Sequence, residues 1–278
     1  MWQDEVSAGE RFEFGANWKK FARAVDDERV QEARRALAAS LRVDSLAGKS
    51  FLDVGGGSGI HSLAARLLGA RVHTFDYDPS SVECARTLRD RFAPGDADWT
   101  IEQGSALDAS YLAKLGHFDI VYSWGVLHHT GDMWRALELV EERVKPGGLL
   151  FLALYNDQGR VSRLWTRVKK AYVGSPRPGK MAITIAAGLY FESRSALGRV
   201  LRLENPLPFA QWEKKKRDRG MSVWTDLVDW VGGYPFEVSK PEEIFELFRT
   251  KGYRLEHLRT CGGGLGCNEY VFRNERSE

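Results

Sequence analysis

Cysteine is scarce in this sequence, and long apolar runs are missing. The three cysteines, Cys84, Cys261 and Cys267, are an odd number, which argues against a disulfide framework and suits a reducing compartment. Two of them, in "CGGGLGC", are too few to ligate a structural zinc ion. Outside the glycine-rich residues 51–65, the longest mostly apolar stretch, "MAITIAAGLYF", covers 11 residues, whereas a transmembrane helix needs about 20. We therefore expect no transmembrane segment and no metal site.

A secretory signal is also missing from the N-terminal residues. "MWQDEVSAGERFEF" has no basic segment followed by an apolar one, so we expect a cytoplasmic protein. Apolar residues make up 43% of the chain and charged residues 28%, and there are 9 Trp, which indicates a folded globular protein. The net charge of +2 is too small to indicate a partner by itself.

Short apolar runs alternate with stretches of helical periodicity through the first 154 residues. This alternation is typical of an α/β protein with a doubly wound sheet. The expected strands are residues 50–54, 71–75, 98–102, 118–123 and 149–154. The expected helices between them are residues 60–68, 79–92 and 132–143, after a helix at 31–40 and an aromatic-rich arm at 11–25.

The alternation stops after the fifth expected strand. We expect three parts: residues 1–155 as the core with its N-terminal helical arm, 156–240 as a mainly helical basic cap, and 241–278 as a helix and strands that complete the core. The insertion holds 16 Lys+Arg and 8 Asp+Glu, which leaves 24 and 30 elsewhere from the totals of 40 and 38. The basic charge is therefore concentrated in the insertion.

The stretch "LDVGGGSG" runs from the first expected strand into a glycine turn that opens a helix. Glycines let the backbone approach a ligand closely, and both dinucleotides and S-adenosylmethionine are bound in this way. The dinucleotide fingerprint needs glycine at the first, third and sixth positions; counted from Gly55 the third is Gly57, but the sixth is Ile60. Glycine comes at Gly59 instead, and Asp53 precedes the turn. A carboxylate there repels a pyrophosphate and suits the amino group of a methionine moiety.

Further candidates follow the next strands, at the edge where open α/β sheets bind ligands. Asp76 ends the second expected strand, 21 residues after Gly55, where a carboxylate can accept hydrogen bonds from both hydroxyls of a ribose. Tyr77, Ser105 and Ala106 are expected to contact the adenine of this ligand. Ser123 and Trp124 are expected to contact it beside the glycine turn.

Taken together, "LDVGGGSG", "FDYDPSSVECAR", "GSALD", "FDIVYSWGVLHH" and "VKPGGLLFLALY" resemble the successive motifs of class I S-adenosylmethionine-dependent methyltransferases. Within that superfamily they are most similar to the ubiquinone-biosynthesis-type small-molecule enzymes. The resemblance covers residues 51 to 155. It implies a Rossmann-like seven-stranded sheet whose last strand, at 268–273, is antiparallel, and S-adenosyl-L-methionine as the cofactor. Ser105 departs from the pattern, because many relatives have an acid there.

Members of this superfamily often close the cofactor site with an N-terminal arm. The resemblance therefore suggests Phe14, Asn17 and Trp18 as a lid, whereas the alternative is that these residues simply pack on the edge of the sheet. Methyl transfer to a hydroxyl needs a base, and a histidine suits proton removal near neutral pH. His128 and His129, just beyond the fourth strand, are the candidates, with His128 slightly preferred; the alternative is that they cap the following helix.

The acceptor is expected to be a small molecule, with oxygen as the preferred methylation site. Its expected contacts are Tyr155 and Asn156 after the fifth strand, and Trp230 and Tyr234 in the insertion. The basic charge of the insertion suits an anionic or lipid-linked acceptor, a membrane surface, or RNA, although the chain shows no RNA-binding module. A cofactor-binding protein without transfer activity is a further alternative. The sequence leaves the identity of the acceptor and the oligomeric state open.

Overall fold

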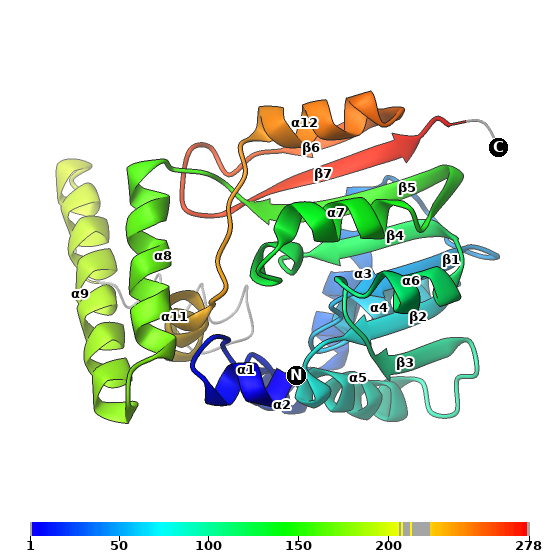
Figure 1. Ribbon diagram of the computed structural model, residues 1–278. Coiled ribbons are helices and arrows are strands. Elements are labelled where there is room, and N and C mark those ends of the chain that lie inside the picture. Colours follow the sequence, from blue (N-terminus) through cyan, green and yellow to red (C-terminus); the bar gives the residue numbers. More distant parts are fainter. Residues whose placement is uncertain (1, 206, 208–211, 213–222, 277–278) are drawn as a thin grey trace. The chain divides into compact units, whose positions relative to one another are not determined.

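One mixed sheet of seven strands lies in residues 14–162 and 236–278 (Figure 1). The computed structural model describes residues 2–205, 207, 212 and 223–276. The strand order is β3-β2-β1-β4-β5-β7-β6, and only β7 runs antiparallel to its neighbours. This confirms the expected doubly wound, Rossmann-like sheet with an antiparallel last strand. The strands are β1 (Ser50–Val54), β2 (Arg71–Asp76), β3 (Trp99–Gln103), β4 (Phe118–Trp124), β5 (Val144–Tyr155), β6 (Tyr253–Arg259) and β7 (Cys267–Asn274).

Helices bury both faces of this sheet, which explains why its central strands are mostly apolar. One core layer holds side chains of α3 (Asp27–Leu41), α4 (Ile60–Leu67) and α5 (Pro79–Phe92). The other holds side chains of α6 (Ala109–Leu115), α7 (Met133–Glu141) and α12 (Pro241–Thr250). A further helix, α2 (Gly15–Ala24), and the 3-10 turn η1 (Leu127–His129) complete this part of the chain.

The strand β5 and the helix α6 differ from the sequence-based expectation, as do α3, which begins at Asp27 and not at residue 31, and the unexpected helix at Trp2–Ser7. The strand β5 begins at Val144 and not at residue 149, because Val144 already pairs with Phe118 before the register shifts and Leu149 pairs with Ile120. The helix α6 was not expected. It begins after Asp108, whose carboxylate accepts a hydrogen bond from Tyr111 N at 3.0 Å, so the N-cap supplied a sequence signal.

The chain divides into two compact units. The sheet unit comprises residues 14–162 and 236–278, and the helical unit comprises 1–13 and 163–235. The helical unit contains α1 (Trp2–Ser7), α9 (Arg177–Leu201), α11 (Val223–Gly232) and most of α8 (Arg160–Val173). The expected division at residues 155 and 240 stays a prediction, and the basic run at 214–217 lies outside the described residues. None of the helices in the described ranges combines the length and apolar character that a bilayer span requires.

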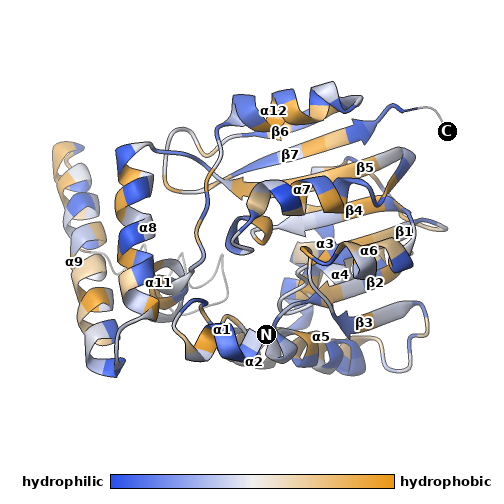
Figure 2. Ribbon diagram, viewed as in Figure 1, coloured by the Kyte–Doolittle hydropathy of each residue, from blue (hydrophilic) through white to orange (hydrophobic). Residues whose placement is uncertain are grey.

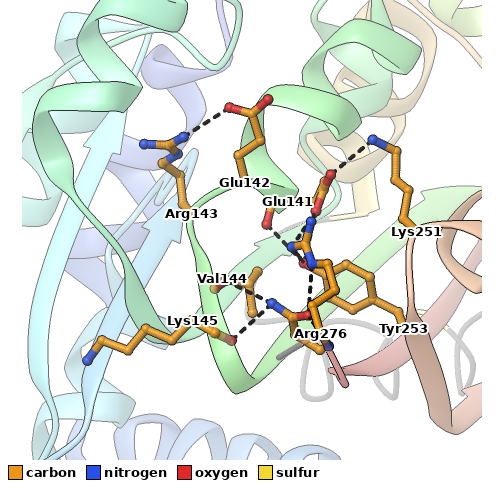
Figure 3. Close-up of polar contacts among 9 residues, drawn as sticks. Glu141, Glu142, Arg143, Val144, Lys145, Lys251, Tyr253 and Arg276 are labelled. Carbon is orange, nitrogen blue, oxygen red and sulfur yellow. Dashed lines mark hydrogen bonds and ion pairs between the residues drawn. The ribbon is translucent and has the colours of Figure 1, made fainter. Parts of the chain in front are cut away.

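A buried carboxylate ties the C-terminal end of α7 to the end of the chain (Figure 3). Glu141 is 2% exposed, and its carboxylate accepts hydrogen bonds from Lys251 Nζ at 2.9 Å, Tyr253 Oη at 3.0 Å and Arg276 Nη2 at 3.0 Å. A buried ion pair with such geometry is costly to break, because the remaining partners lose their counter-charge. The network therefore joins α7 to β6 and to the residues after β7, away from the glycine turn.

Candidate functional site

The glycine turn between β1 and α4 has positions that only glycine fits. Gly55 has a φ of +75°, and a Cβ there would lie 2.3 Å from the side chain of Val126. Gly59 has a φ of +82°, and a Cβ there would lie 2.9 Å from Ala85. The amides of Gly55 and Gly56 both donate to Phe75 O, at 2.8 and 3.1 Å, which joins the turn to the end of β2. The turn is therefore fixed, and its residues Gly55, Gly56 and Gly57 are partly exposed.

Asp53 lies beneath this turn and is almost completely buried. Its carboxylate accepts a short hydrogen bond from Ser62 Oγ, which in turn is 2.7 Å from Thr74 Oγ1. Thr74 also accepts from Trp99 Nε1 at 2.9 Å, so a chain of polar groups crosses the sheet unit from α4 to β3. Burial raises the pKa of Asp53 to about 7. A nearby cation would favour the ionised form, and a contact with a ligand amino group stays a prediction.

Asp76 joins the glycine turn to the segment that follows β2. Its Oδ2 accepts from Gly57 N at 2.9 Å and its Oδ1 accepts from Asp78 N at 2.9 Å. Burial raises the pKa of Asp76 to about 6, although its backbone hydrogen bonds act in the opposite direction. The structure thus brings Asp76 and the glycine turn together, and a contact of Asp76 with a ribose stays a prediction.

The expected adenine contacts lie at the ends of β2 and β3. Ala106 is 7% exposed and its methyl group belongs to the core, so only its backbone is available to a ligand. Ser105 Oγ accepts from Leu107 N at 3.2 Å and shapes its own turn. Tyr77 O accepts from Gln103 Nε2 at 3.1 Å, which links the two strand ends. Direct contacts of these residues with a base stay predictions.

At the end of β4 one expected contact points inward and the other outward. Ser123 is 1% exposed, and its hydroxyl donates to Val54 O at 3.3 Å, so the hydroxyl proton is used in a hydrogen bond between β4 and β1. Trp124 is 39% exposed, and its indole Nε1 donates to Glu269 Oε1 at 3.1 Å. Trp124 pairs with Ala153, and Ala153 pairs with Glu269, so the indole crosses above the small alanine. Sequence reasoning missed Glu269, because only the antiparallel register of β7 brings it here.

The two histidines of η1 have different surroundings. His128 is completely buried, and its Nδ1 accepts a hydrogen bond from Tyr155 N at 3.2 Å. An accepting Nδ1 has no proton, so the neutral ring has its proton on Nε2. His129 is partly exposed, and its ring lies 4.9 Å from Phe14 and 4.5 Å from His128. The two histidines therefore differ in burial and in hydrogen bonding, and a catalytic role of either one stays a prediction.

The residues just before α12 hold this histidine turn from one side. Glu237 N donates to His128 O at 2.9 Å, and Glu237 Oε2 accepts from Met133 N at 3.0 Å, at the first residue of α7. Burial raises the pKa of Glu237. Ser239 N donates to Tyr155 O at 2.9 Å. Sequence reasoning missed both residues, because nothing local indicates that they return to β5.

Asn156 is fixed by the last strand. Its Oδ1 accepts from Asn268 Nδ2 at 3.0 Å, and its backbone amide donates to Gly266 O at 2.9 Å. Asn268 is completely buried and also accepts from Cys261 N at 3.1 Å. Asn156 and Tyr155 thus lie at the end of β5 near the histidine turn, and their contact with an acceptor stays a prediction.

The arm helix α2 lies against the glycine turn. Gly15 N donates to Asp78 Oδ2 at 2.8 Å, and Asp78 Oδ1 caps α5 by accepting from Ser80 N at 2.8 Å. A Cβ at Gly57 would lie 3.2 Å from the indole of Trp18, so this side chain covers the turn. Asp78 was not predicted, although an Asp before Pro79 is an N-cap signal. The side chain of Asn17 lies outside what the structure describes.

Trp230 and Tyr234 belong to the helical unit. The ring of Trp230 lies 4.2 Å from Lys169 Nζ and 5.9 Å from the ring of Trp165. Lys169 is completely buried and also donates to Trp230 O, and burial lowers its pKa to about 7. Tyr234 O accepts from Phe12 N at 2.9 Å. The predicted acceptor contacts of Trp230 and Tyr234 stay predictions. Among the described residues, no three His, Cys, Asp or Glu side chains lie close enough to hold a metal ion.

Comparisons with known proteins agree with this geometry. Residues 23–202 match the family model of the methyltransferase domain. The ubiquinone biosynthesis O-methyltransferase of Xanthomonas oryzae pv. oryzae is 35% identical over 117 residues, which are 42% of this chain and 47% of that protein. The enzyme of the same name from Azotobacter vinelandii is 34% identical over 111 residues, 40% of this chain and 46% of that protein. The matches thus span about half the length of these curated relatives.

Solved structures share the fold at low sequence identity. The magnesium protoporphyrin IX methyltransferase of Synechocystis PCC 6803, solved with bound SAH, has a TM-score of 0.53 at 13% identity, over 88% of this chain and 83% of that one. A putative methyltransferase of Haloferax volcanii, solved with its activator, has a TM-score of 0.54 at 15% identity, over 96% and 97% of the two chains. At these identities the similarity shows the fold.

Proposed function

Since the chain belongs to the methyltransferase domain family, we propose that it transfers a methyl group from S-adenosylmethionine to a hydroxyl oxygen of a small molecule. The observation that supports this most is the hydrogen bond between Gly57 N and Asp76 Oδ2, at 2.9 Å. It places a carboxylate at the end of β2 directly beside a backbone that a ligand can approach. The O-methyltransferase relatives support oxygen as the methylated atom.

The residues of the sheet unit fit this cofactor. The carboxylate of Asp76 would accept hydrogen bonds from the ribose hydroxyls, and the backbone of the glycine turn would contact the methionine moiety. Asp53 lies under the turn, where a Cβ at Gly56 would be 3.3 Å from its Oδ2, and would balance the charge of an ammonium group. Tyr77 and the backbone at Ser105 and Ala106 would contact the adenine. The cofactor supplies a methyl group on a sulfonium, which already includes the leaving group.

The chain itself must orient the acceptor and remove its proton. Orientation contributes up to about 7–11 kcal/mol, whereas a general base contributes about 10²–10⁴ in rate. We assign the base to His129, because its ring is partly exposed, and assign to His128 the role of holding the turn to Tyr155. Tyr155 and Asn156 would orient the acceptor at the end of β5.

Calorimetric titration with S-adenosylhomocysteine tests the cofactor. We expect micromolar binding by the wild-type protein and loss of binding in Asp76→Ala. Asp90→Ala, at an exposed position on α5, is the matched control and should bind normally. Binding of NAD in place of S-adenosylhomocysteine would contradict the proposal.

A second experiment separates a transferase from a cofactor-binding protein without activity. The protein is incubated with labelled S-adenosylmethionine and a panel of phenols, catechols, hydroxy acids and sugars, and methylated products are identified by mass spectrometry. A product whose formation is strongly reduced in His129→Gln supports the proposal. Equal activity in His129→Gln would exclude His129 as the base. Methylation of RNA alone would exclude a small-molecule acceptor.

A further inference from the structure

The long helix α9 has an exposed apolar face. Figure 2 shows hydrophobic residues along much of this helix. Leu189 is 68% exposed, Leu197 60% and Leu201 77%, values that are high for leucine. We call the α9 face the exposed apolar side chains of this helix: Met181, Ile185, Leu189, Leu197, Val200 and Leu201. Met181, Ile185 and Leu189 recur at four-residue spacing along one side of the helix, and Leu197, Val200 and Leu201 follow two turns later.

The opposite side of α9 already packs within the helical unit. The ring of Phe191 stacks on Trp165 of α8 at 5.1 Å, and Thr184 and Ala187 are buried. The α9 face is therefore distinct from the side of the helix that packs within the unit. Exposed apolar surface of this kind marks an interaction site.

Basic residues are frequent on α8 and α9. Residues 163–202 contain 9 Lys+Arg and a single acid, Glu192. Two of these cations, Lys169 and Arg199, are buried, and Lys180 is partly exposed. The exposed ones are Arg163, Arg167 and Lys170 on α8, and Arg177, Arg194 and Arg202 on or next to α9. The surface thus combines aliphatic side chains with a strong excess of positive charge.

We propose that the α9 face docks on the surface of an anionic lipid bilayer. Leu, Ile, Met and Val side chains would enter the boundary between head groups and acyl chains, and the Arg and Lys side chains would contact the lipid phosphates. The helix is 25 residues long, yet Glu192, Arg194 and Arg199 interrupt its sequence, and none of the described helices has the character of a bilayer span. It therefore lies in the plane of the interface.

A second copy of this chain and RNA both fit the surface less well than an anionic bilayer. A second copy of this chain would bring the same excess of positive charge against itself, and like charges across an interface are unfavourable. RNA would satisfy the basic residues, and Tyr190, 45% exposed on α9, could stack on a base, but the aliphatic side chains that make up most of the face would gain no contact of this kind. An anionic bilayer complements both the charge and the apolar face.

Vesicle flotation with the full chain tests this proposal. We expect binding to vesicles of equimolar phosphatidylglycerol and phosphatidylcholine and little binding to phosphatidylcholine alone. Leu189→Gln with Leu201→Gln should weaken binding about tenfold or more, through lost apolar contact. Arg167→Glu with Lys170→Glu should weaken it by about 25-fold or more, because each basic residue contributes about fivefold.

The matched control is Arg34→Glu with Arg35→Glu, which makes the same charge change at exposed positions of α3 and should leave binding unchanged. Equal loss in this control, no binding of the wild-type chain to anionic vesicles, or equal binding to both vesicle types would overturn the proposal. The proposal would also be overturned if light scattering showed that the wild-type chain is a dimer and that Leu189→Gln with Leu201→Gln converts it to a monomer. S-adenosylhomocysteine binding, measured on the same samples, reports on the proposed function separately.

Discussion

The backbone amide of Tyr155, at the end of β5, donates a hydrogen bond to Nδ1 of His128 at 3.2 Å. Glu237 N donates to the carbonyl oxygen of the same histidine at 2.9 Å. His128 is therefore held through both its ring and its backbone, and its ring is completely buried. His129, the next residue, keeps a partly exposed ring beside Phe14. Two adjacent histidines thus have separate tasks in the proposed mechanism.

The first prediction separates these tasks. His129→Gln should leave the melting temperature nearly unchanged and lower the rate of methyl transfer about 10²–10⁴-fold. His128→Leu should lower the free energy of unfolding by about 1–3 kcal/mol, because the buried amide of Tyr155 loses its acceptor. Thermal denaturation and turnover with the acceptor found by screening measure the two effects. A stable His128→Leu together with a fully active His129→Gln would contradict the division.

The second prediction concerns cofactor affinity and pH. Ribose hydroxyls donate to an ionised carboxylate, and the pKa of Asp76 is raised by burial to about 6. Protonation below pH 6 competes with the ligand, so the affinity for S-adenosylhomocysteine should fall by up to about tenfold per pH unit below this value. Calorimetry between pH 5 and pH 8 measures it. In Asp76→Asn the affinity should be low and nearly independent of pH; an unchanged pH profile in that variant would assign the effect to another group.

Asp53 should make the protein less stable as the pH rises. Its pKa is about 7 in the folded protein, whereas the pKa of an exposed aspartate is about 3.9. Between these values the folded state binds more protons than the unfolded state, so the free energy of unfolding decreases with increasing pH. The effect amounts to about 4 kcal/mol at most. Asp53→Asn keeps an acceptor for Ser62 and should be more stable than wild type near pH 8, with the difference vanishing near pH 4. Urea denaturation at several pH values tests this, and a constant difference would contradict it.

The network around Glu141 should be essential for stability (Figure 3). Glu141→Ala removes the acceptor of three hydrogen bonds and should cost about 1–3 kcal/mol of unfolding free energy, because Lys251 and Arg276 are 29% and 40% exposed and water can solvate the charges left behind. Glu142→Ala is the control, since Glu142 is 56% exposed and its ion pair with Arg143 should contribute less than about 1 kcal/mol. Urea denaturation distinguishes them. Similar losses of unfolding free energy in both variants would show that the buried network stabilises the protein no more than an exposed ion pair does.

The contact between Asp78 and Gly15 should hold the arm helix α2 in place. Asp78→Ser keeps an oxygen that can cap α5 but is too short to reach Gly15 N as well. Amide hydrogen exchange in residues 15–24 should become faster in this variant, while exchange in α5 stays slow. Asp108→Ser, at the N-cap of α6, is the matched control and should leave the arm unchanged. Equal protection of the arm in Asp78→Ser would mean that other contacts hold it.

Much of the sheet unit could be predicted from local sequence. The alternation of apolar runs with helical periodicity located the seven strands and most of the helices, although not α6, because both faces of a doubly wound sheet must be buried. β5 was predicted too short, since its first residues pair across a register shift that no local pattern shows. The candidate cofactor residues Gly57 and Asp76 were also found together, because a parallel sheet brings the ends of neighbouring strands to one edge.

Local sequence patterns were enough to identify the succession of strands and helices, the glycine turn and the two acids beside it, because strand periodicity, tight turns and capping depend on residues near one another in the chain. Which distant groups meet could be seen only in the folded structure. Trp124 reaches Glu269 through the register of β7, Gly15 meets Asp78 through the packing of α2, and His128 is fixed by Tyr155 and Glu237. Such contacts depend on strand register and on the path of segments that return after many residues, and neither leaves a local signal. The tautomer of His128, and with it the choice of His129 as the base, follows from those contacts.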